Sequence, residues 1–210
     1  MNSENKVQWV YASENNLQLQ ERYDEWAKDY DEDLEADFGY VIPRIAAETF
    51  AQLVPKDAKV LDAGAGTGLV GVELHRLGYR NIEAMDLSRG MLEEARRKRV
   101  YGGFHQMTMG EPLDFDTGSF DAVICVGVLT LGHAPARSLD ELARVVRPGG
   151  FVVFTLRPDV YEQNGFKEKQ RQLESDGTWE LTHVTEEFLG LPKGEPDVLF
   201  QVWMYRVRPR

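Results

Sequence analysis

Residues 60–68 have the sequence Val60-Leu61-Asp62-Ala63-Gly64-Ala65-Gly66-Thr67-Gly68. The apolar residues at the start predict a short buried strand, and the glycines predict a tight turn into a helix over residues 69–77. Glycine also lets a ligand approach the backbone closely, and ligands of parallel sheets bind outside the carboxyl ends of the strands. The turn is therefore the first candidate for a binding site.

An acidic residue ends the next predicted strand, which covers residues 81–86. Asp86 can accept hydrogen bonds there from both hydroxyls of a ribose. A dinucleotide fingerprint would need a third glycine at position 69, which is leucine. Asp62, two residues before the first glycine, suits a ligand ammonium group and repels a pyrophosphate. A ribose combined with a cation describes S-adenosylmethionine (SAM); the alternative is that Asp62 only braces the loop.

The rest of the chain alternates strands and helices, which predicts a parallel sheet covered on both faces. Further strands are predicted at residues 104–109, 120–126, 151–156, 179–184 and 198–207. Further helices are predicted at residues 17–33, 45–53, 89–100, 138–146 and 161–175, with Ser88 as an N-cap. The last two strands have no helix between them, so they should pair antiparallel at one edge. The predicted fold is α/β and doubly wound, with a mostly parallel, seven-stranded, Rossmann-like sheet and an antiparallel C-terminal edge strand.

Composition and charge exclude several classes of protein. The chain has 210 residues, of which 42% are hydrophobic and 28% charged, as is typical of a globular domain. A net charge of −11 is a poor match to phosphates, so no nucleic-acid partner is expected. No apolar run approaches the roughly 20 residues of a membrane span, and no signal peptide is evident, so we expect no membrane partner and a cytoplasmic location. With one cysteine and four scattered histidines, no metal site is expected. We expect a monomer or a weak homodimer.

Four motifs together resemble those of class I SAM-dependent methyltransferases, over roughly residues 20–156. They are residues 60–68, 85–92, 120–124 and 142–150. Residues 110–113 and 126–127 make the pattern similar to the methyltransferase-like 27 group of that family. The fourth strand lacks the Asn/Asp-Pro-Pro-Tyr/Phe box of DNA methyltransferases that act on exocyclic amines, which counts against a nucleobase amine as the methyl acceptor.

The resemblance implies SAM as the cofactor, S-adenosylhomocysteine as the product and a small organic molecule as the acceptor. In the family, the acid that corresponds to Asp86 holds the ribose, and the next residue packs on adenine. A tyrosine of an N-terminal lid helix, such as Tyr30 here, lies over the methionine end. Met109 stands where an acid often meets the adenine amino group, so Glu111 or the backbone near Gly110 is expected to take that role. The implied cofactor site consists of Tyr23, Tyr30, Asp62, Ala63, Gly64, Ala65, Gly66, Asp86, Leu87, Met91, Gly110, Glu111 and Val126.

The same pattern divides the chain into three parts. Residues 1–20 are a polar N-terminal tail, residues 21–55 a helical lid, and residues 56–210 a Rossmann-like catalytic domain that binds SAM. The first 16 residues are polar and are expected to be loosely held. The lid helix is expected to be mobile without SAM and to become ordered on binding.

Candidates for the acceptor side of the site follow the fourth and fifth strands. Methyl transfer needs mainly alignment of the reactants, but a hydroxyl or ammonium acceptor also needs a base. His133 is the candidate base; the alternative is a loop histidine bonded to the backbone. Arg157 can pair with an acidic substrate or be a solvated strand end. Aromatic side chains can wall an apolar acceptor cavity or belong to the core; they are Trp9, Tyr11, Tyr23, Trp26, Tyr30, Trp179 and Trp203.

Three functions remain open from the sequence. The chain is a methyltransferase acting on a small molecule, a methyltransferase acting on a protein, or a SAM-binding protein that transfers no methyl group. The acidic charge favours the first. A deep apolar cavity would distinguish the first from the second, for which an open groove is expected, and a fold alone does not fix the reaction.

Overall fold

The computed structural model describes residues 3–130 and 132–209, and side chains from Lys6 onward within these ranges. Its helices are α1 (Ser3–Tyr11), α2 (Asn16–Trp26), α3 (Tyr30–Asp33), the π-helix η1 (Leu34–Phe38), α4 (Ile42–Phe50), α5 (Leu69–Arg76), α6 (Arg89–Arg97), α7 (Ser138–Val145), α8 (Pro158–Gln163) and α9 (Phe166–Ser175). Its strands are β1 (Val60–Ala63), β2 (Ile82–Asp86), β3 (Gly103–Gln106), β4 (Phe120–Cys125), β5 (Val146–Leu156), β6 (Trp179–Val184), β7 (Phe188–Leu189) and β8 (Leu199–Val207).

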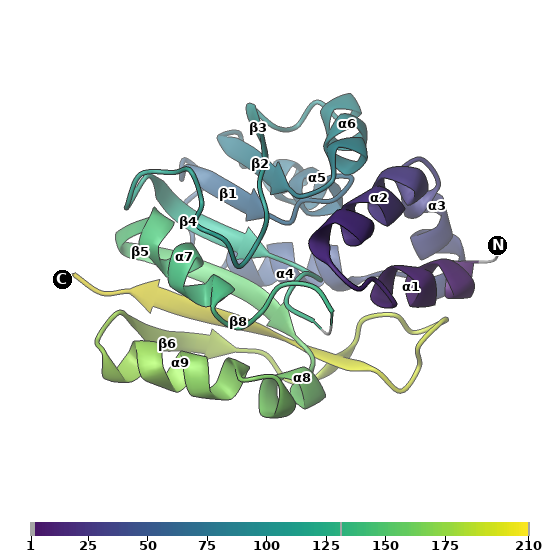
Figure 1. Ribbon diagram of the computed structural model, residues 1–210. Helices are drawn as coiled ribbons and strands as arrows, with labels where there is room; N and C mark the ends of the chain where they lie inside the picture. The colour runs from purple at the N-terminus through teal and green to yellow at the C-terminus, as the bar shows by residue number, and fades with distance from the viewer. Residues whose placement is uncertain (1–2, 131, 210) are drawn as a thin grey trace.

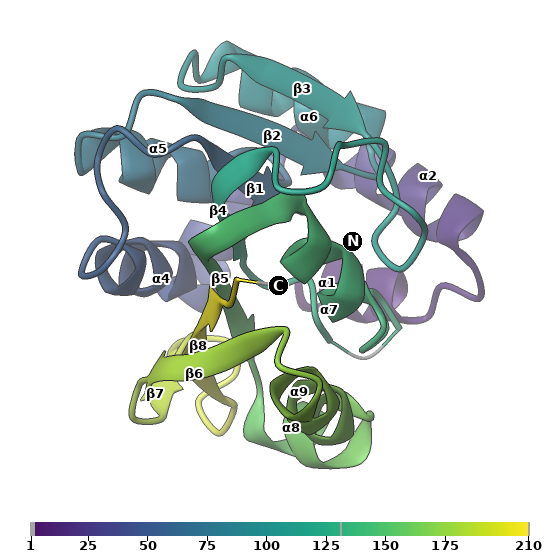
Figure 2. The same cartoon turned by 90° about the vertical axis from the view of Figure 1, so that its left-hand side faces the viewer.

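The strands form a sheet in the order β3-β2-β1-β4-β5-β8-β6, with helices on both faces (Figures 1 and 2). Strands β1 to β5 run parallel, β8 runs antiparallel to both β5 and β6, and β7 pairs with β8 off this path. The predicted α/β, doubly wound class is confirmed. The strand order reverses between β1 and β4, which is where such sheets bind their ligands.

The C-terminal strand lies one position inside the sheet, whereas the prediction put it at the edge. Val202 and Met204 pack in the core on one face, and Trp203 and Tyr205 pack in the core on the other. A strand that is apolar on both faces is stable only where both are covered. β6, which carries the exposed Leu181, takes the edge, and the predicted antiparallel pairing of the last two long strands is confirmed.

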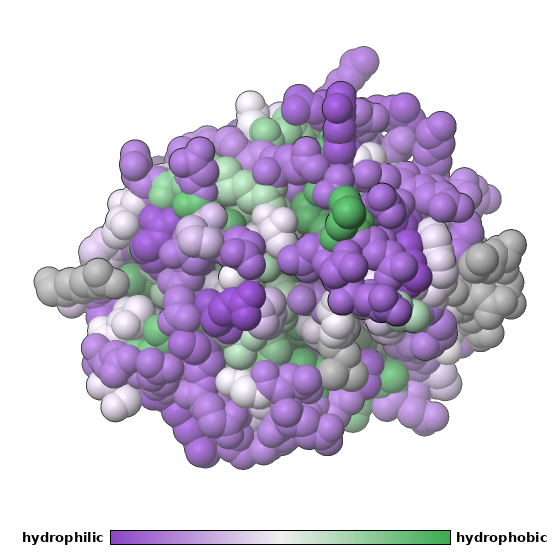
Figure 3. Space-filling view, in the orientation of Figure 1, coloured by the Kyte–Doolittle hydropathy of each residue, from purple (hydrophilic) through white to green (hydrophobic). Residues whose placement is uncertain are grey.

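Two hydrophobic cores hold the layers together. One lies between the sheet and α7, α8 and α9, and it includes Leu142, Phe166 and the fully buried Trp179. The other lies between the sheet and α4 and α5, and it includes Phe50 and Leu74. The face shown in Figure 3 is mostly hydrophilic, with hydrophobic atoms in small separate groups, as expected when the apolar side chains lie in these cores.

The N-terminal helices α1, α2, α3 and η1 lie together at the carboxyl ends of the parallel strands (Figure 1). From here on we call these four helices the lid; they include α1, which was expected to be part of a tail, and leave out α4, which packs in the core. They share a cluster that includes Val10, Leu19 and Trp26. The prediction that the first 16 residues are loosely held is wrong for α1, because Val10 is buried in this cluster. The two valines of α1, at positions 7 and 10, form an apolar stripe too short to stand out in the sequence.

Other element boundaries shift for local reasons. The predicted helix over 17–33 is interrupted near Ala27, and η1 ends at Gly39, which has a φ of 62°. The predicted helix over 161–175 divides into α8 and α9 at Gly165, which has a φ of 78°. In the described ranges, every helix is too short or too polar to cross a membrane.

Candidate functional site

The loop between β1 and α5 is fastened to the end of β2. The amides of Gly64 and Ala65 donate hydrogen bonds to the carbonyl of Met85 at 2.7 and 2.9 Å. Gly64 and Gly66 have φ values of 80° and 53°, in the region that glycine adopts without strain. A Cβ on Gly66 would meet no heavy atom within 4 Å, whereas a Cβ on Gly64 would lie 2.2 Å from Cγ2 of Val128. The loop therefore faces open space at Gly66 and packs tightly at Gly64.

Asp86, the last residue of β2, lies in the wall of a cavity beside this loop. Its carboxylate accepts hydrogen bonds from the amides of Gly66 at 2.8 Å and Ser88 at 2.9 Å. Burial raises the pKa of Asp86 to about 6, although these amides favour the charged form. Ser88 caps α6 by accepting from the amide of Met91, as the sequence predicted. The carboxylate is thus held in one orientation before any ligand arrives.

Asp62 lies on the same face of the sheet but below the loop. It pairs in register with Ala84, two residues from Asp86, and alternate residues of a strand share a face. Its Oδ2 accepts a 2.6 Å hydrogen bond from the Tyr101 hydroxyl, and its buried Oδ1 has no partner among the described atoms. Burial raises the pKa of Asp62 to about 7, with the Tyr101 bond opposing the rise and the charge of Asp86 adding to it. The structure brings the two carboxylates together, but only Asp86 lines the cavity.

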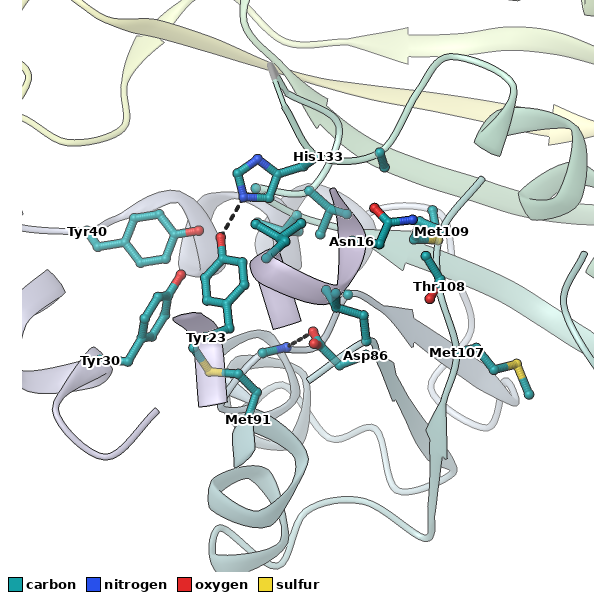
Figure 4. A pocket seen from close by; sticks show the side chains of 18 residues that line it. Asn16, Tyr23, Tyr30, Tyr40, Asp86, Met91, Met107, Thr108, Met109 and His133 are labelled. Carbon is teal, nitrogen blue, oxygen red and sulfur yellow. Dashed lines mark hydrogen bonds between the residues drawn. The ribbon is translucent and has the colours of Figure 1, made fainter. Parts of the chain in front are cut away.

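The cavity, open to solvent and about 700 Å³ in volume, lies between the glycine loop and the lid (Figure 4). Figure 4 shows three tyrosines on one side and residues 107–109 on the other. Nine of the predicted residues line it: Tyr23, Tyr30, Gly64, Gly66, Asp86, Leu87, Met91, Val126 and His133. Nine others that line it were not predicted: Asn16, Leu19, Tyr40, Met107, Thr108, Met109, Gly127, Val128 and Ala134.

Five predicted residues do not line this cavity. Asp62 lies below the loop, Ala63 packs in the core on the opposite face of the sheet, and Ala65 packs against Leu92 of α6. The carbonyl of Gly110 accepts a 2.8 Å hydrogen bond from Nε of Arg137, and Glu111 is exposed and lies 3.6 Å from Arg137. Both are thereby drawn toward the start of α7. Residues 107–109 take their place in the wall.

The lid is fastened to the rest of the site by two acidic side chains. Asp24 of α2 accepts hydrogen bonds from the Ser88 hydroxyl at 2.5 Å and the Gly90 amide at 2.7 Å. Asp31 of α3 accepts from the Thr67 hydroxyl and the Lys98 ammonium group. These carboxylates join the lid to the first turn of α6 and to the glycine loop, so the lid closes one side of the cavity.

Tyr23 and His133 connect the lid to the segment after β4. The Tyr23 hydroxyl and Nε2 of His133 lie 2.8 Å apart (Figure 4). The His133 ring also makes an edge contact with Tyr11, with ring centroids 5.2 Å apart. Burial raises the pKa of Tyr23 well above its usual value, so the hydroxyl keeps its proton at neutral pH. The histidine ring is therefore oriented by two lid tyrosines.

A second cavity of about 720 Å³, also open to solvent, adjoins the first. The two cavities share Tyr23, Tyr30, Tyr40 and Gly127 as lining residues. A Cβ on Gly127 would lie 2.9 Å from the Tyr40 hydroxyl, so the absence of a side chain there leaves room where the cavities meet.

The sequence candidates for the acceptor side divide between this second cavity and the core. Arg157 lines the cavity, as do four of the predicted aromatics, Tyr11, Tyr23, Trp26 and Tyr30. Trp179 and Trp203 belong to the core between the sheet and α7–α9, and Trp9 packs in the lid cluster. In residues 3–130 and 132–209, histidine, cysteine and carboxylate side chains form no group of three that could hold a metal.

A family model described as "Methyltransferase domain" matches residues 61–154. Human methyltransferase-like protein 27 is 38% identical over 165 residues, which are 75% of this chain and 66% of that protein. A ubiquinone biosynthesis O-methyltransferase of Alkalilimnicola ehrlichii is 35% identical over 46% of this chain and 40% of its own length. The matches therefore span less than two thirds of these curated relatives.

Solved structures show the same fold at low sequence identity. A SAM-dependent methyltransferase from Thermotoga maritima, described as a possible histamine N-methyltransferase, has a TM-score of 0.63 at 19% identity and covers 88% of this chain and 97% of its own. The [4+2]-cyclase SpnF has a TM-score of 0.74 at 16% identity and covers 93% of this chain and 97% of its own. Proteins named for two different activities, a methyltransferase and a cyclase, therefore share this fold.

The raised pKa values of Asp62 and Asp86 predict a pH-dependent stability. The folded chain binds protons at these carboxyls up to about pH 7 and 6, whereas the unfolded chain releases them near pH 4. Folding therefore takes up protons in this window, so the unfolding free energy should rise as the pH falls from about 8 to about 5. Urea denaturation of the ligand-free protein measures this slope. Asp62→Asn should flatten it, and Asp57→Asn, an exposed change in the loop before β1, should leave it intact. An equal slope in all three proteins would contradict the assignment.

Removal of the Asp24 carboxylate should loosen the lid. Asp24→Ala deletes the acceptor for Ser88 and Gly90 at the start of α6, and loss of a capping carboxylate costs about 0.5–2 kcal/mol. Hydrogen exchange should become faster in residues 16–33 and stay unchanged in α9. The control is Glu25→Ala, which changes the exposed neighbouring acid. Unaltered protection of α2 in the Asp24 variant would show that other contacts hold the lid.

Proposed function

Because the chain belongs to the class I SAM-dependent methyltransferase family, we propose that it transfers a methyl group from SAM to a small organic molecule. The observation that carries this proposal is the pair of adjoining cavities. One cavity has a carboxylate and a glycine loop in its wall, and the other is mainly apolar and lies under the lid. SAM belongs in the first cavity and the acceptor in the second.

The residues of the first cavity fit SAM on three counts. Open space stands above Gly66, where a Cβ would meet no atom within 4 Å. The buried carboxylate of Asp86 suits two ribose hydroxyls, and the ionised form of Asp62 nearby adds negative potential that favours a cation. Met91 and Leu87 offer apolar surface on which the adenine ring can pack. We assign Asp86 to the ribose, Leu87, Met91 and residues 107–109 to the adenine, and Tyr30 with the loop to the methionine end.

When bound, SAM would supply a methyl group on a positively charged sulfur. Transfer joins the acceptor atom to the methyl carbon and breaks the carbon–sulfur bond. The electron pair of that bond stays on sulfur, so the product is S-adenosylhomocysteine. The chain's own contribution is to hold the acceptor in line and to exclude water. Such orientation supplies about 7–11 kcal/mol in favourable cases. The shared wall of Tyr23, Tyr30, Tyr40 and Gly127 sets where the acceptor atom must lie.

A proton path leads away from that wall. Tyr23 lines both cavities, whereas His133 lines only the first. We therefore assign Tyr23 as the group that meets an acceptor hydroxyl and His133 as the base behind it. The Tyr23 hydroxyl receives the acceptor proton as it passes its own to Nε2 of His133, 2.8 Å away. The tyrosine never has to ionise, which agrees with its raised pKa.

The lid over the second cavity supports a small acceptor over a protein segment. The lid contributes residues from α1, α2, α3 and η1 to its wall, so an acceptor must fit beneath these helices. A protein acceptor would need an open groove. The remaining alternative is SAM binding without methyl transfer, and a cyclase of the same fold is the reason to test turnover directly, since fold does not fix the reaction.

The proposal predicts both binding and transfer. Calorimetry should show binding of SAM and of S-adenosylhomocysteine, and Asp86→Ala should weaken both about tenfold or more, as expected for hydrogen bonds to a charged group. Incubation with SAM labelled in its methyl group and a metabolite extract should then label a low-molecular-weight fraction. Label found only in protein would favour a protein acceptor. Binding with no label in any fraction would favour a SAM-binding protein of another function.

The proton path predicts a shared effect of two substitutions. With a hydroxyl acceptor, Tyr23→Phe and His133→Asn should each lower kcat about 100-fold or more and should remove the same acidic limb of the pH–rate profile. The double variant should be little worse than either single one, because the two residues act as a unit. His105→Asn is the control, since His105 pairs with Glu83 outside both cavities. Retention of the wild-type profile in both single variants would rule out the path.

A further inference from the structure

The second cavity carries charge of one sign. Among its described lining residues, Arg157 is the one with a full charge, and the others are apolar or carry neutral hydroxyls or indole. The first cavity has the opposite character, with Asp86 in its wall. This difference in charge restricts which molecules the second cavity accepts.

Arg157 is held in place by a partner that leaves part of it available. It follows β5 directly, and its side chain is 22% exposed. Asp159 accepts hydrogen bonds from Nε at 3.0 Å and from Nη2 at 2.7 Å. These two bonds fix the plane of the guanidinium and leave Nη1 without a protein acceptor among the described residues. Asp159 does not line the cavity, so the cavity side of the pair is the cation.

Two further groups lie within electrostatic reach of Arg157. The Tyr11 hydroxyl, on α1, lies in the wall of the cavity, and Glu195 lies in the loop before β8, outside the cavity lining. Burial raises the pKa of Tyr11, with Glu195 adding to the rise and Arg157 opposing it. Tyr11 therefore stays a neutral hydroxyl, and its proton is a second donor in the wall that contains Arg157.

The part of the wall that the second cavity shares with the first presents only neutral hydroxyls. Burial raises the pKa of Tyr23, Tyr30 and Tyr40 above the usual tyrosine value. None of the described residues that line the second cavity is a carboxylate, and Asp86, whose charge reaches Tyr23 and Tyr30, belongs to the wall of the first cavity. An ammonium group in this cavity would lose its hydration without gaining a counter-charge, which is costly in an apolar site. An anionic group gains the guanidinium, which binds carboxylates and phosphates well.

We propose that the methyl acceptor is an apolar or aromatic molecule with a neutral reacting hydroxyl and a separate anionic group that Arg157 binds. This inference rests on the proposed function, since it specifies the acceptor of that reaction. The hydroxyl lies toward Tyr23 and Gly127, where the cavities join. The anion lies toward Arg157 and the Tyr11 hydroxyl.

The test compares two probes of one skeleton and opposite charge. 4-Hydroxyphenylacetate and tyramine both carry a phenol, but one ends in a carboxylate and the other in an ammonium group. Calorimetry measures their binding to the full chain saturated with S-adenosylhomocysteine. The acid should bind about tenfold or more tightly than the amine, as expected for a hydrogen bond to a charged group. Equal affinity, tighter binding of the amine, or binding of neither probe would overturn the inference.

Variants of Arg157 complete the test. Arg157→Met should abolish the preference for the acid, and Arg157→Lys, which keeps the charge, should keep part of it. Arg208→Met is the matched control, because Arg208 also binds a carboxylate, that of Glu180, through Nε and Nη2, far from the lining of either cavity; it should keep the full preference. A preference that survives in Arg157→Met overturns the inference. Saturation with S-adenosylhomocysteine must succeed in every variant, and its failure in the unaltered chain would refute the proposed function instead.

Discussion

The hydrogen bond from the Gly66 amide to the Asp86 carboxylate is the contact on which the site depends. It ties the turn after β1 to the tip of β2, and the bonds from Gly64 and Ala65 to Met85 hold the same junction from the other side. Folding therefore places a carboxylate in a poorly hydrated position, which raises its pKa. A ligand that donates hydrogen bonds to this carboxylate, as the ribose hydroxyls of the proposed cofactor do, replaces the hydration that the buried charge lacks. The same contact thus shapes the loop and selects the ligand.

The lid uses the edge of this junction as its anchor. Asp24 binds the first turn of α6 through Ser88 and Gly90, directly after the strand that ends at Asp86. Asp31 reaches the glycine loop at Thr67. Because both anchors lie in the segments that directly follow β1 and β2, any movement of those segments acts on the lid as well. The cavity under the lid and the cavity at the loop are therefore mechanically linked.

The parts of the site that the sequence predicted are those whose chemistry is local. The glycine loop, Asp86 and the Ser88 cap each lie in a short segment where residue type dictates backbone conformation or hydrogen bonding. Tyr40 and Asn16 reach the same cavity only through the path of the lid, and nothing in their immediate neighbours marks them. Gly110 and Glu111 were predicted to line the cavity but lie outside it, because Arg137, which is distant in the sequence, contacts both of them.

The features of the fold that the sequence predicted are also those that depend on local sequence. Alternating strands and helices predicted the doubly wound class, because each element has its own periodicity. Periodicity predicts a strand but not its place in the sheet. β8 lies inside the sheet because residues 202–205 are apolar on both faces. This apolar run was the available signal in the sequence. A strand that is apolar on both faces needs cover on both, and a position at the edge of the sheet provides less of it. The burial of α1 had only Val7 and Val10 to indicate it.

The two cavities divide the electrostatic work of the proposed reaction. We place the positive methyl donor in the cavity that contains Asp86, the anionic group of the acceptor beside Arg157, and the reacting atoms between the neutral tyrosines that both cavities share. A fixed charge at the meeting point would bind either the sulfonium or an ionised acceptor in the ground state, and uniform binding of this kind does not speed the chemical step. Hydroxyl dipoles hold the acceptor without that cost. The tyrosines with raised pKa values therefore stand where the reaction needs polarity without charge.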